Sequence, residues 1–213
     1  MEHPPERRGR VTLAHAERGA RERSPRRVRP GGRFRQLAFD VHVFGIILRD
    51  SDADPDAGMG GVGVGLRYRP LPHFALEGSL EFGLGTDYNG YDRREGALLA
   101  SVVGFLNPES TVTVYALTGL GLGVADVTID GGSGDLPVAS YDESYRYFGM
   151  HLGGGVEVRV SRRTSVRAEL LGFVRARTDD DREQRPEFVD PVTHRATNTS
   201  GGGIVRVGAL FYF

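Results

Sequence analysis

Strict alternation of side chains marks the stretch GVGVGLRYR, residues 61–69. Val62, Val64, Leu66 and Tyr68 occupy every second position, and glycine or arginine fills the positions between them. Successive side chains of a β-strand point to opposite faces, so a period of two predicts a strand with one apolar face and one small or polar face. A helix would instead repeat its apolar residues about every 3.6 positions. This stretch therefore predicts an all-β fold.

The same period of two recurs throughout the chain beyond residue 33, and it predicts eight strands. They cover about residues 34–49, 57–69, 73–85, 96–106, 111–126, 145–160, 164–177 and 203–213. Two places fit less well. Residues 44–48 are apolar on both faces, and residues 96–106 are almost entirely apolar, so the facing of these two segments stays open.

The connections between these strands alternate in length. Three are tight turns, at residues 70–72, 107–110 and 161–163, and four are long and mostly acidic, at about residues 50–56, 86–95, 127–144 and 178–200. A transmembrane barrel has short turns at its periplasmic end and long loops outside. Each predicted strand also reaches the 9–11 residues that a tilted strand needs to cross a bilayer. We therefore expect an eight-stranded antiparallel up-and-down transmembrane β-barrel over residues 34–213.

Alternation alone does not say which face of the barrel points inward. A soluble barrel such as a lipocalin buries its apolar face, whereas a membrane barrel turns that face to lipid. The interior of an eight-stranded barrel is just wide enough for side chains, so a polar face that carries both charges suits it. The expected lumen charge network is Asp40, His42, Arg67, Glu77, Glu81, His151, Glu157, Arg159, Arg167, Glu169, Arg175 and Arg206. The expected membrane-interface aromatics are Tyr68, Phe74, Phe82, Phe148, Phe211 and Phe213.

The composition agrees with a barrel and excludes several other classes. The chain holds 31 glycines and no cysteine. Repeated glycine within strands marks close approach of backbone to backbone. The lack of cysteine excludes disulfides, thiolate metal ligands and a thiol nucleophile. No stretch of 18 apolar residues is present, so no transmembrane helix is expected.

An arginine-rich segment, residues 1–33, precedes the predicted barrel. Residues 1–35 carry eleven arginines against four acidic residues, whereas residues 36–213 carry sixteen against twenty-four, a net charge of −8. A basic tail can bind nucleic acid or anionic lipid, but the scattered proline and glycine here predict a disordered tail without a nucleic-acid partner. The segment has no apolar core of 7–15 residues, so it is not a signal peptide. Export to an outer membrane would then require a different start site.

Three segments resemble the OmpA/OmpX-type outer membrane protein β-barrel family. They are GGGVEVRVSRRTSVRAEL at residues 153–170, VYALTGLGLG at residues 114–123 and GALFYF at residues 208–213. The resemblance covers about residues 34–213. It implies a place in the bacterial outer membrane, among lipid and lipopolysaccharide, with no cofactor. The terminal Phe213 resembles the signal that the barrel-assembly machinery reads. The chain has no peptidoglycan-binding domain like the one that follows the barrel in full-length OmpA proteins, so cell-wall anchoring is not expected.

Two sequence motifs invite a chemical interpretation that their surroundings do not support. Residues 58–63, GMGGVG, match G-x-G-x-x-G, but a dinucleotide site needs a helix after the motif and here a strand follows. Asp50, Asp52, Asp54 and Asp56 could offer oxygen ligands to Ca²⁺ or Mg²⁺. Pro55 occupies the position where an EF-hand loop needs glycine, so we expect a solvated acidic loop rather than a specific metal site.

Histidine and aspartate on the polar face leave one catalytic alternative open. Asp40 and His42 share a strand face, and His151 lies on the polar face of another strand; an Asp that orients a His can serve a hydrolase. No convincing nucleophile accompanies them, so we expect a structural or surface-interaction role without a continuous pore, and no enzyme activity. The alternatives are a soluble or periplasmic lipocalin-like ligand-binding barrel and a membrane-barrel hydrolase. An extracellular ligand would contact the long loops at residues 50–56, 86–95, 127–144 and 178–200.

Overall fold

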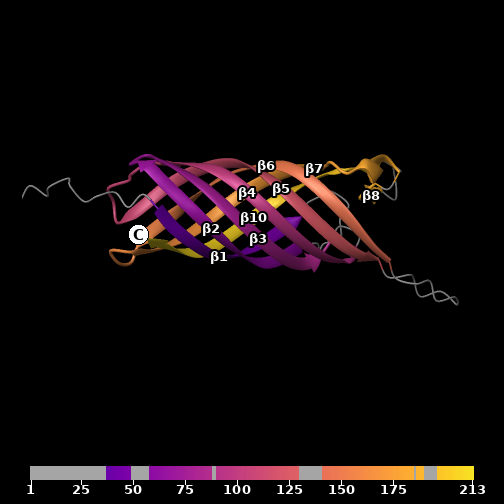
Figure 1. The fold of residues 1–213 in the computed structure, drawn as a ribbon, viewed down its shortest axis with the longest axis horizontal. Helices are drawn as coiled ribbons and strands as arrows, with labels where there is room; N and C mark the ends of the chain where they lie inside the picture. The colour runs from indigo at the N-terminus through magenta and orange to yellow at the C-terminus, as the bar shows by residue number, and fades with distance from the viewer. Residues whose placement is uncertain (1–36, 49–57, 88–89, 130–140, 185, 190–195) are drawn as a thin grey trace, which may run out of the picture. The chain divides into compact units, whose positions relative to one another are not determined.

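The structure is a computed structural model that describes residues 37–48, 58–87, 90–129, 141–184, 186–189 and 196–213. Eight antiparallel strands close into a barrel in the order β1-β10-β7-β6-β5-β4-β3-β2, so each strand pairs with its neighbours in the chain and the last pairs with the first (Figure 1). This confirms the predicted fold. The predicted tail, residues 1–33, and the acidic loop at residues 50–56 lie outside the described residues.

The barrel strands are long compared with an ordinary strand of five or six residues. They are β1 (Leu37–Leu48), β2 (Gly58–Leu71), β3 (Phe74–Thr86), β4 (Asp92–Phe105), β5 (Val112–Ile129), β6 (Tyr141–Arg159), β7 (Thr164–Arg177) and β10 (Thr199–Tyr212). Between β7 and β10 lie a short 3-10 helix (Asp180–Glu183) and a two-stranded sheet of β8 (Phe188–Val189) and β9 (Ala196–Thr197). Among the described residues, no helix is long and apolar enough to cross a membrane.

Four predicted boundaries were wrong at the long-loop end, because the strands continue into segments expected to be loops. β4 begins at Asp92, β5 runs to Ile129, β6 begins at Tyr141 and β10 begins at Thr199. The added residues are mainly charged in β4 and β6 and small or polar in β10, so the period of two in hydrophobicity is lost there while the backbone pairing continues. Arg94 still pairs with Asp126, for example.

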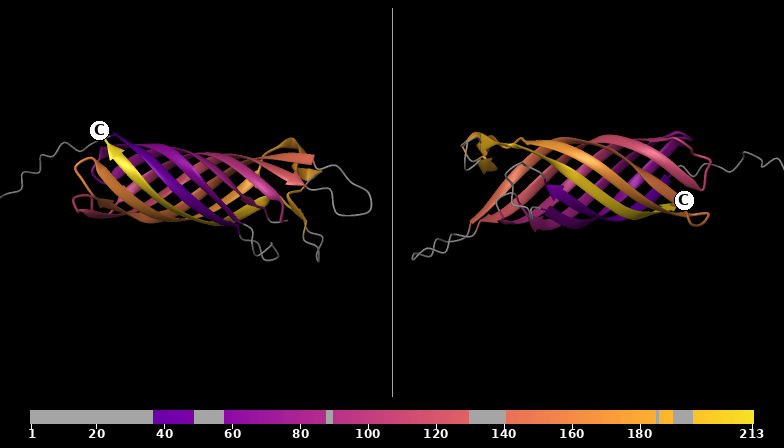
Figure 2. Two further views of the ribbon diagram at one scale, coloured as in Figure 1. Left: turned by 90° about the horizontal axis from the view of Figure 1, so that it is seen from below. Right: turned by 180° about the vertical axis from the view of Figure 1, so that it is seen from behind.

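The strands are strongly tilted around the barrel, as two further views show (Figure 2). Paired residues can be followed once round the wall: Leu37, Tyr68, Leu76, Val102, Thr118, Leu152, Gly172, Gly203 and Ile47. The circuit returns to β1 at Ile47, ten residues beyond its start at Leu37. A stagger of this kind sets the strand tilt and width of a closed barrel.

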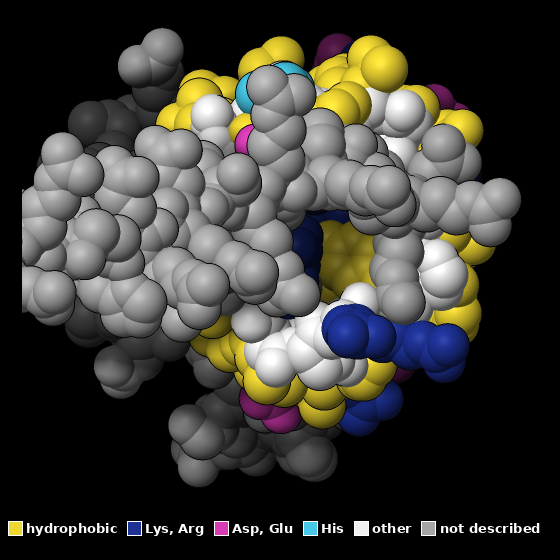
Figure 3. All heavy atoms as spheres, turned by 90° about the vertical axis from the view of Figure 1, so that its left-hand side faces the viewer, with side chains coloured by type: hydrophobic (Ala, Val, Ile, Leu, Met, Phe, Trp, Pro, Cys, Tyr) yellow, Lys and Arg dark blue, Asp and Glu magenta, His cyan; other side chains and the backbone are white. Residues whose placement is uncertain are grey.

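The apolar face points outward and the polar face points inward. Along β3, Leu80 is 59% exposed, Glu81 7% and Phe82 52%, and the same alternation runs along the other strands. A soluble barrel would have the opposite arrangement. Figure 3, which looks on to one end of the barrel, shows hydrophobic side chains around the outer rim and arginine atoms beside a central hollow.

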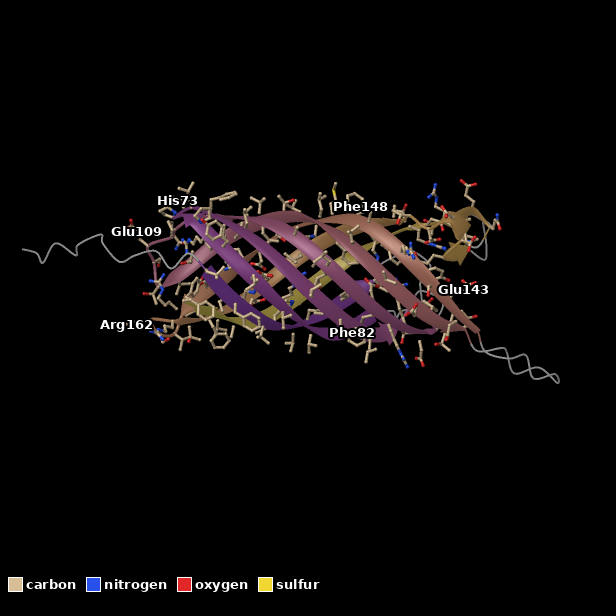
Figure 4. All side chains as sticks on the ribbon, viewed as in Figure 1. His73, Phe82, Glu109, Glu143, Phe148 and Arg162 are labelled. Atoms are coloured by element: carbon tan, nitrogen blue, oxygen red, sulfur yellow. The ribbon has the colours of Figure 1, made fainter. Side chains whose placement is uncertain are left out.

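The tight turns all lie at one end of the barrel, together with the C-terminus. Figure 4 places His73, Glu109 and Arg162, one from each turn region, at this end and Glu143 at the other. We call these the short-turn end and the long-loop end. A transmembrane barrel has its short turns in the periplasm, so the long-loop end corresponds to the cell exterior.

Candidate functional site

The lumen contains two layers of ion pairs separated by an apolar layer. In the layer near the short-turn end, Arg67 of β2 is completely buried. Its Nε donates to Glu77 over 2.7 Å, and its Nη1 donates to Glu157 of β6, across the lumen, over 2.8 Å. The guanidinium also lies 5.4 Å from the centre of the Tyr115 ring. Burial of an arginine requires partners of this kind, because an unpaired buried charge is very costly.

Arg167 of β7 is the second hub of this layer. Its Nη1 donates to Glu77 over 2.7 Å and to Glu169 over 2.8 Å. Its Nη2 donates to Asp40 over 2.6 Å. Glu77 therefore lies between two arginines, Arg67 and Arg167, and links β2, β3 and β7 through one carboxylate.

His42 extends the layer along β1. Its Nδ1 lies 2.6 Å from Asp40 Oδ2, and its Nε2 lies 3.0 Å from Glu81 Oε1. Both ring nitrogens can donate at once only in the imidazolium form. Glu81 also forms an ion pair with Arg206 of β10 at 2.7 Å. The Asp40 and His42 pair that suggested a hydrolase is thus embedded in a network of fixed charges.

A serine and a histidine that the sequence did not associate lie next to this network. Ser101 Oγ and His151 Nε2 are 2.8 Å apart, and both residues are buried. A hydrolytic triad also needs a group that orients the histidine. Within the described part of the chain, no carboxylate hydrogen-bonds to the His151 ring. The pair satisfies two buried polar groups in the wall.

The second ion-pair layer lies near the long-loop end. Arg93 pairs with Glu95 of the same strand at 3.0 Å and with Glu187 at 2.9 Å. Arg175 pairs with Glu95 and donates to Ser200 Oγ over 2.8 Å. Glu187 differs from the others because it belongs to the connection between β7 and β10 rather than to the barrel wall.

The structure places eleven of the twelve residues of the expected lumen network in buried positions. Arg159 is the exception, because it is exposed. It shares the inward face of β6 with Glu157 but is the last residue of that strand, where the lumen opens to water. Arg159 therefore lies on the expected inward face but outside the buried part of the network.

Other lumen residues were not among those expected. They are Arg69, Arg93, Glu95, Tyr115, Tyr147, Arg177 and Glu187. Arg69 and Arg177 lie on the polar faces that the alternation defines in β2 and β7, although the expected network did not include them. Arg93 and Glu95 fall in residues 86–95, which the sequence pattern predicts to be a loop. Glu187 lies outside the barrel strands. The alternation of apolar and polar residues therefore could not identify these three as lumen residues.

The expected interface aromatics lie on the outer surface of the wall. Phe213 is 74% exposed and Phe82 52% exposed, whereas Phe74 is half-buried. Tyr68, Phe148 and Phe211 are likewise exposed. Figure 4 shows Phe82 and Phe148 pointing away from the barrel. Whether these rings form belts at the two membrane interfaces stays a prediction.

The wall and the interior together define a class of protein, the transmembrane β-barrels of the bacterial outer membrane. The family model described as the outer membrane protein beta-barrel domain matches residues 11–186, and the chain belongs to this family. A search of curated proteins finds no significant match.

Three solved structures of bacterial proteins have a similar fold. Neisserial surface protein A (NspA) has a TM-score of 0.55 at 14% identity, and the match covers 83% of this chain and 97% of NspA. A major outer membrane protein from Thermus thermophilus has a TM-score of 0.54 at 14% identity, covering 83% and 99%. Ail, the attachment invasion locus protein of Yersinia pestis, has a TM-score of 0.53 at 15% identity, covering 84% and 98%. These similarities concern the fold. They agree with a location in the bacterial outer membrane.

Proposed function

We propose that this protein is a non-conducting barrel that presents a polar surface outside the bacterial cell. The proposal rests on the length of β4, β5 and β6, whose ends at the long-loop end carry polar rather than apolar outward-facing side chains. The outward-facing side chains of β5 are mostly apolar up to Val124 and then become polar, at Asp126 and Thr128. On β6 the same change occurs between Phe148 and Arg146.

The polar ends of these strands form one continuous sheet surface, which we call the outer platform. Its outward-facing residues are Asp92, Arg94, Asp126, Thr128, Asp142, Ser144 and Arg146. Register places Asp126 beside both Arg94 and Ser144, and Thr128 beside both Asp92 and Asp142. Ser144 donates to Asp126, and Thr128 donates to Asp142 over 3.0 Å. A strand needs only about 9–11 residues to cross the bilayer, so the 18 residues of β5 reach well beyond it.

A surface that is held rigid by backbone pairing suits recognition, because little conformational entropy is lost when a partner binds. Ail has been solved with the heparin analogue sucrose octasulfate, a polyanion. The outer platform here carries three aspartates against two arginines. Its charge favours a neutral or cationic partner over a polyanion.

Adhesion of intact cells tests the proposal. Cells that display the barrel, with an export signal supplied, are compared with cells that lack it on surfaces coated with cationic, neutral or anionic polymer. We expect increased adhesion to the cationic or neutral surface, and loss of this increase in the triple variant Asp92→Asn, Asp126→Asn, Asp142→Asn. A variant with Val124→Leu on the lipid face is the matched control. Equal adhesion of cells with and without the barrel would contradict a surface-interaction role.

We also propose that the barrel is not an enzyme and that Phe213 acts as an assembly signal. The His151 ring of the Ser101 and His151 pair has no orienting carboxylate among the described residues, which supports the first point. The backbone N–H of Phe213 donates to the Leu37 carbonyl over 3.0 Å, at the seam between first and last strands. The exposed ring of Phe213 at this seam supports its role as an assembly signal.

A further inference from the structure

A small chamber lies in the lumen between the two ion-pair layers. Its volume is about 70 Å³. Apolar side chains form most of its wall, among them Phe44, Ile46, Leu99, Phe173 and Ile204. A single water molecule needs roughly 10–15 Å³ of such space, so the chamber has room for about five to seven small heavy atoms.

The chamber exists because inward-facing positions at this height lack side chains. Gly83, Gly121, Gly123 and Gly149 line it from three strands and Ala97 from a fourth. An added Cβ at Gly123 would meet no atom closer than 3.7 Å, whereas one at Gly149 would lie 2.6 Å from Arg175. The space is thus free at Gly123 and already used at Gly149.

Polar groups bound the chamber at both ends. Glu81 and His151 line it on the side of the short-turn end, and both are held in the hydrogen bonds described above. Glu95, Tyr147 and Arg175 line it on the side of the long-loop end. The barrier toward the short-turn end is built entirely from wall residues. The barrier toward the exterior includes Glu187, whose segment is not part of the wall.

Arg175 gives the chamber a specific polar contact. The residue is 8% exposed, and its Nη2 has no hydrogen-bond partner among the described residues. Nη1 is already paired with Glu95, so the local charge is balanced. The unused N–H groups therefore favour a neutral hydrogen-bond acceptor over a second anion. A mostly apolar pocket with a few convergent polar groups is the usual form of a small-molecule site.

We propose that this chamber binds a small, neutral, mostly apolar molecule with one hydrogen-bond acceptor, such as a short-chain ketone or alcohol. The acceptor receives a hydrogen bond from Arg175, and the alkyl part contacts the apolar wall. The molecule enters from the long-loop end when Glu187 separates from Arg93. This binding is independent of the outer platform and goes beyond the proposed surface role.

Methyl NMR of the full chain in lipid nanodiscs tests the proposal, with 2-pentanone as the probe and n-pentane as its apolar counterpart. Methyl groups of Ile46, Leu99 and Ile204 report on the chamber, and those of the lipid-facing Leu120 and Leu152 report on partition into lipid. We expect saturable shifts of the chamber methyls with 2-pentanone, with a Kd on the order of 1 mM. The lipid-facing methyls should shift only linearly.

Variants separate binding in the chamber from other effects. Ala97→Leu fills the space and should weaken binding at least about tenfold, and Ala100→Leu, on the lipid face of the same strand, should leave it unchanged. Gly123→Ala is a milder second filling variant in case Ala97→Leu does not fold. The double variant Arg175→Met, Glu95→Gln should abolish the preference for 2-pentanone over n-pentane. Linear shifts at every methyl, equal binding by both filling variants and wild type, or ordered water alone in the chamber would overturn the proposal.

Discussion

The charge network near the short-turn end makes a quantitative prediction about stability. The change is Arg167→Met, which keeps most of the apolar stem but removes the guanidinium. Arg167 donates hydrogen bonds to Asp40, Glu77 and Glu169 at 2.6 to 2.8 Å. Removing one member of a buried charge network typically costs about 3–5 kcal/mol, because the remaining charges lose their compensation.

The remaining contacts set the expected value within that range. Asp40 keeps His42, and Glu77 keeps Arg67. Glu169 keeps the hydroxyl of Tyr115, which donates to it over 2.8 Å. No carboxylate is left entirely without a partner, so we expect a loss of about 3 kcal/mol, the lower part of the range.

Urea unfolding in detergent micelles measures the effect, and Arg159→Met is the matched control. Arg159 is exposed at the same end of the barrel, so its loss should change the free energy of unfolding by no more than about 0.5 kcal/mol. With a typical urea m-value of roughly 1–3 kcal/mol per M, Arg167→Met should lower the midpoint by at least about 1 M. Asp40→Asn in the Arg167→Met background should recover part of the loss, because it removes excess negative charge. Equal midpoints for the Arg167 and Arg159 variants would refute the compensation argument.

Three further predictions concern the lumen, the long-loop end and the C-terminus. Purified protein in planar bilayers should give no large, steady conductance, because both ion-pair layers cross the lumen; a stable open level would contradict this. Hydrogen bonds from Arg177 hold the pKa of Asp179 below its ordinary value of 3.8, so their contribution to stability is present above that pH and is lost as the pH falls through the lowered pKa. Asp179→Asn should therefore cost up to about 1 kcal/mol at pH 7, with the difference from wild type shrinking below pH 3.8, as pH-dependent unfolding would measure. Deletion of Phe213 should lower outer-membrane abundance in cells yet leave refolding in detergent nearly intact, since one interfacial ring contributes only about 1.5–3 kcal/mol; equal abundance would remove the assembly-signal argument.

Strand number and facing were predictable from the sequence because each depends on a local pattern. The alternation in residues 61–69 and 164–177 predicts which side chains share a face, and the narrow interior of an eight-stranded barrel predicts that the charged face points inward. The pairing itself was not predictable. Glu157 is the register neighbour of Arg167 on the adjacent strand, yet it bonds to Arg67 across the lumen. Contacts across the lumen depend on which residues of opposite strands lie at the same level along the barrel axis. The ten-residue stagger of the closed barrel sets these levels.

The two places where alternation failed in the sequence have a common structural cause. Residues 44–48 belong to β1 and residues 96–105 to β4, and both segments contribute apolar side chains to the lumen, including Phe44, Ile46 and Leu99. A strand segment with lipid on one side and an apolar chamber on the other has no polar face, so apolar and polar residues do not alternate along it. An interior filled only by ion pairs would have kept the alternation along all eight strands. The break at Phe44, Ile46 and Leu99 therefore marks the chamber within the sequence, whereas the inward Val103 and Phe105 pack beside the ion-pair layer near the short-turn end. Departures from a local pattern are expected at positions that form a site.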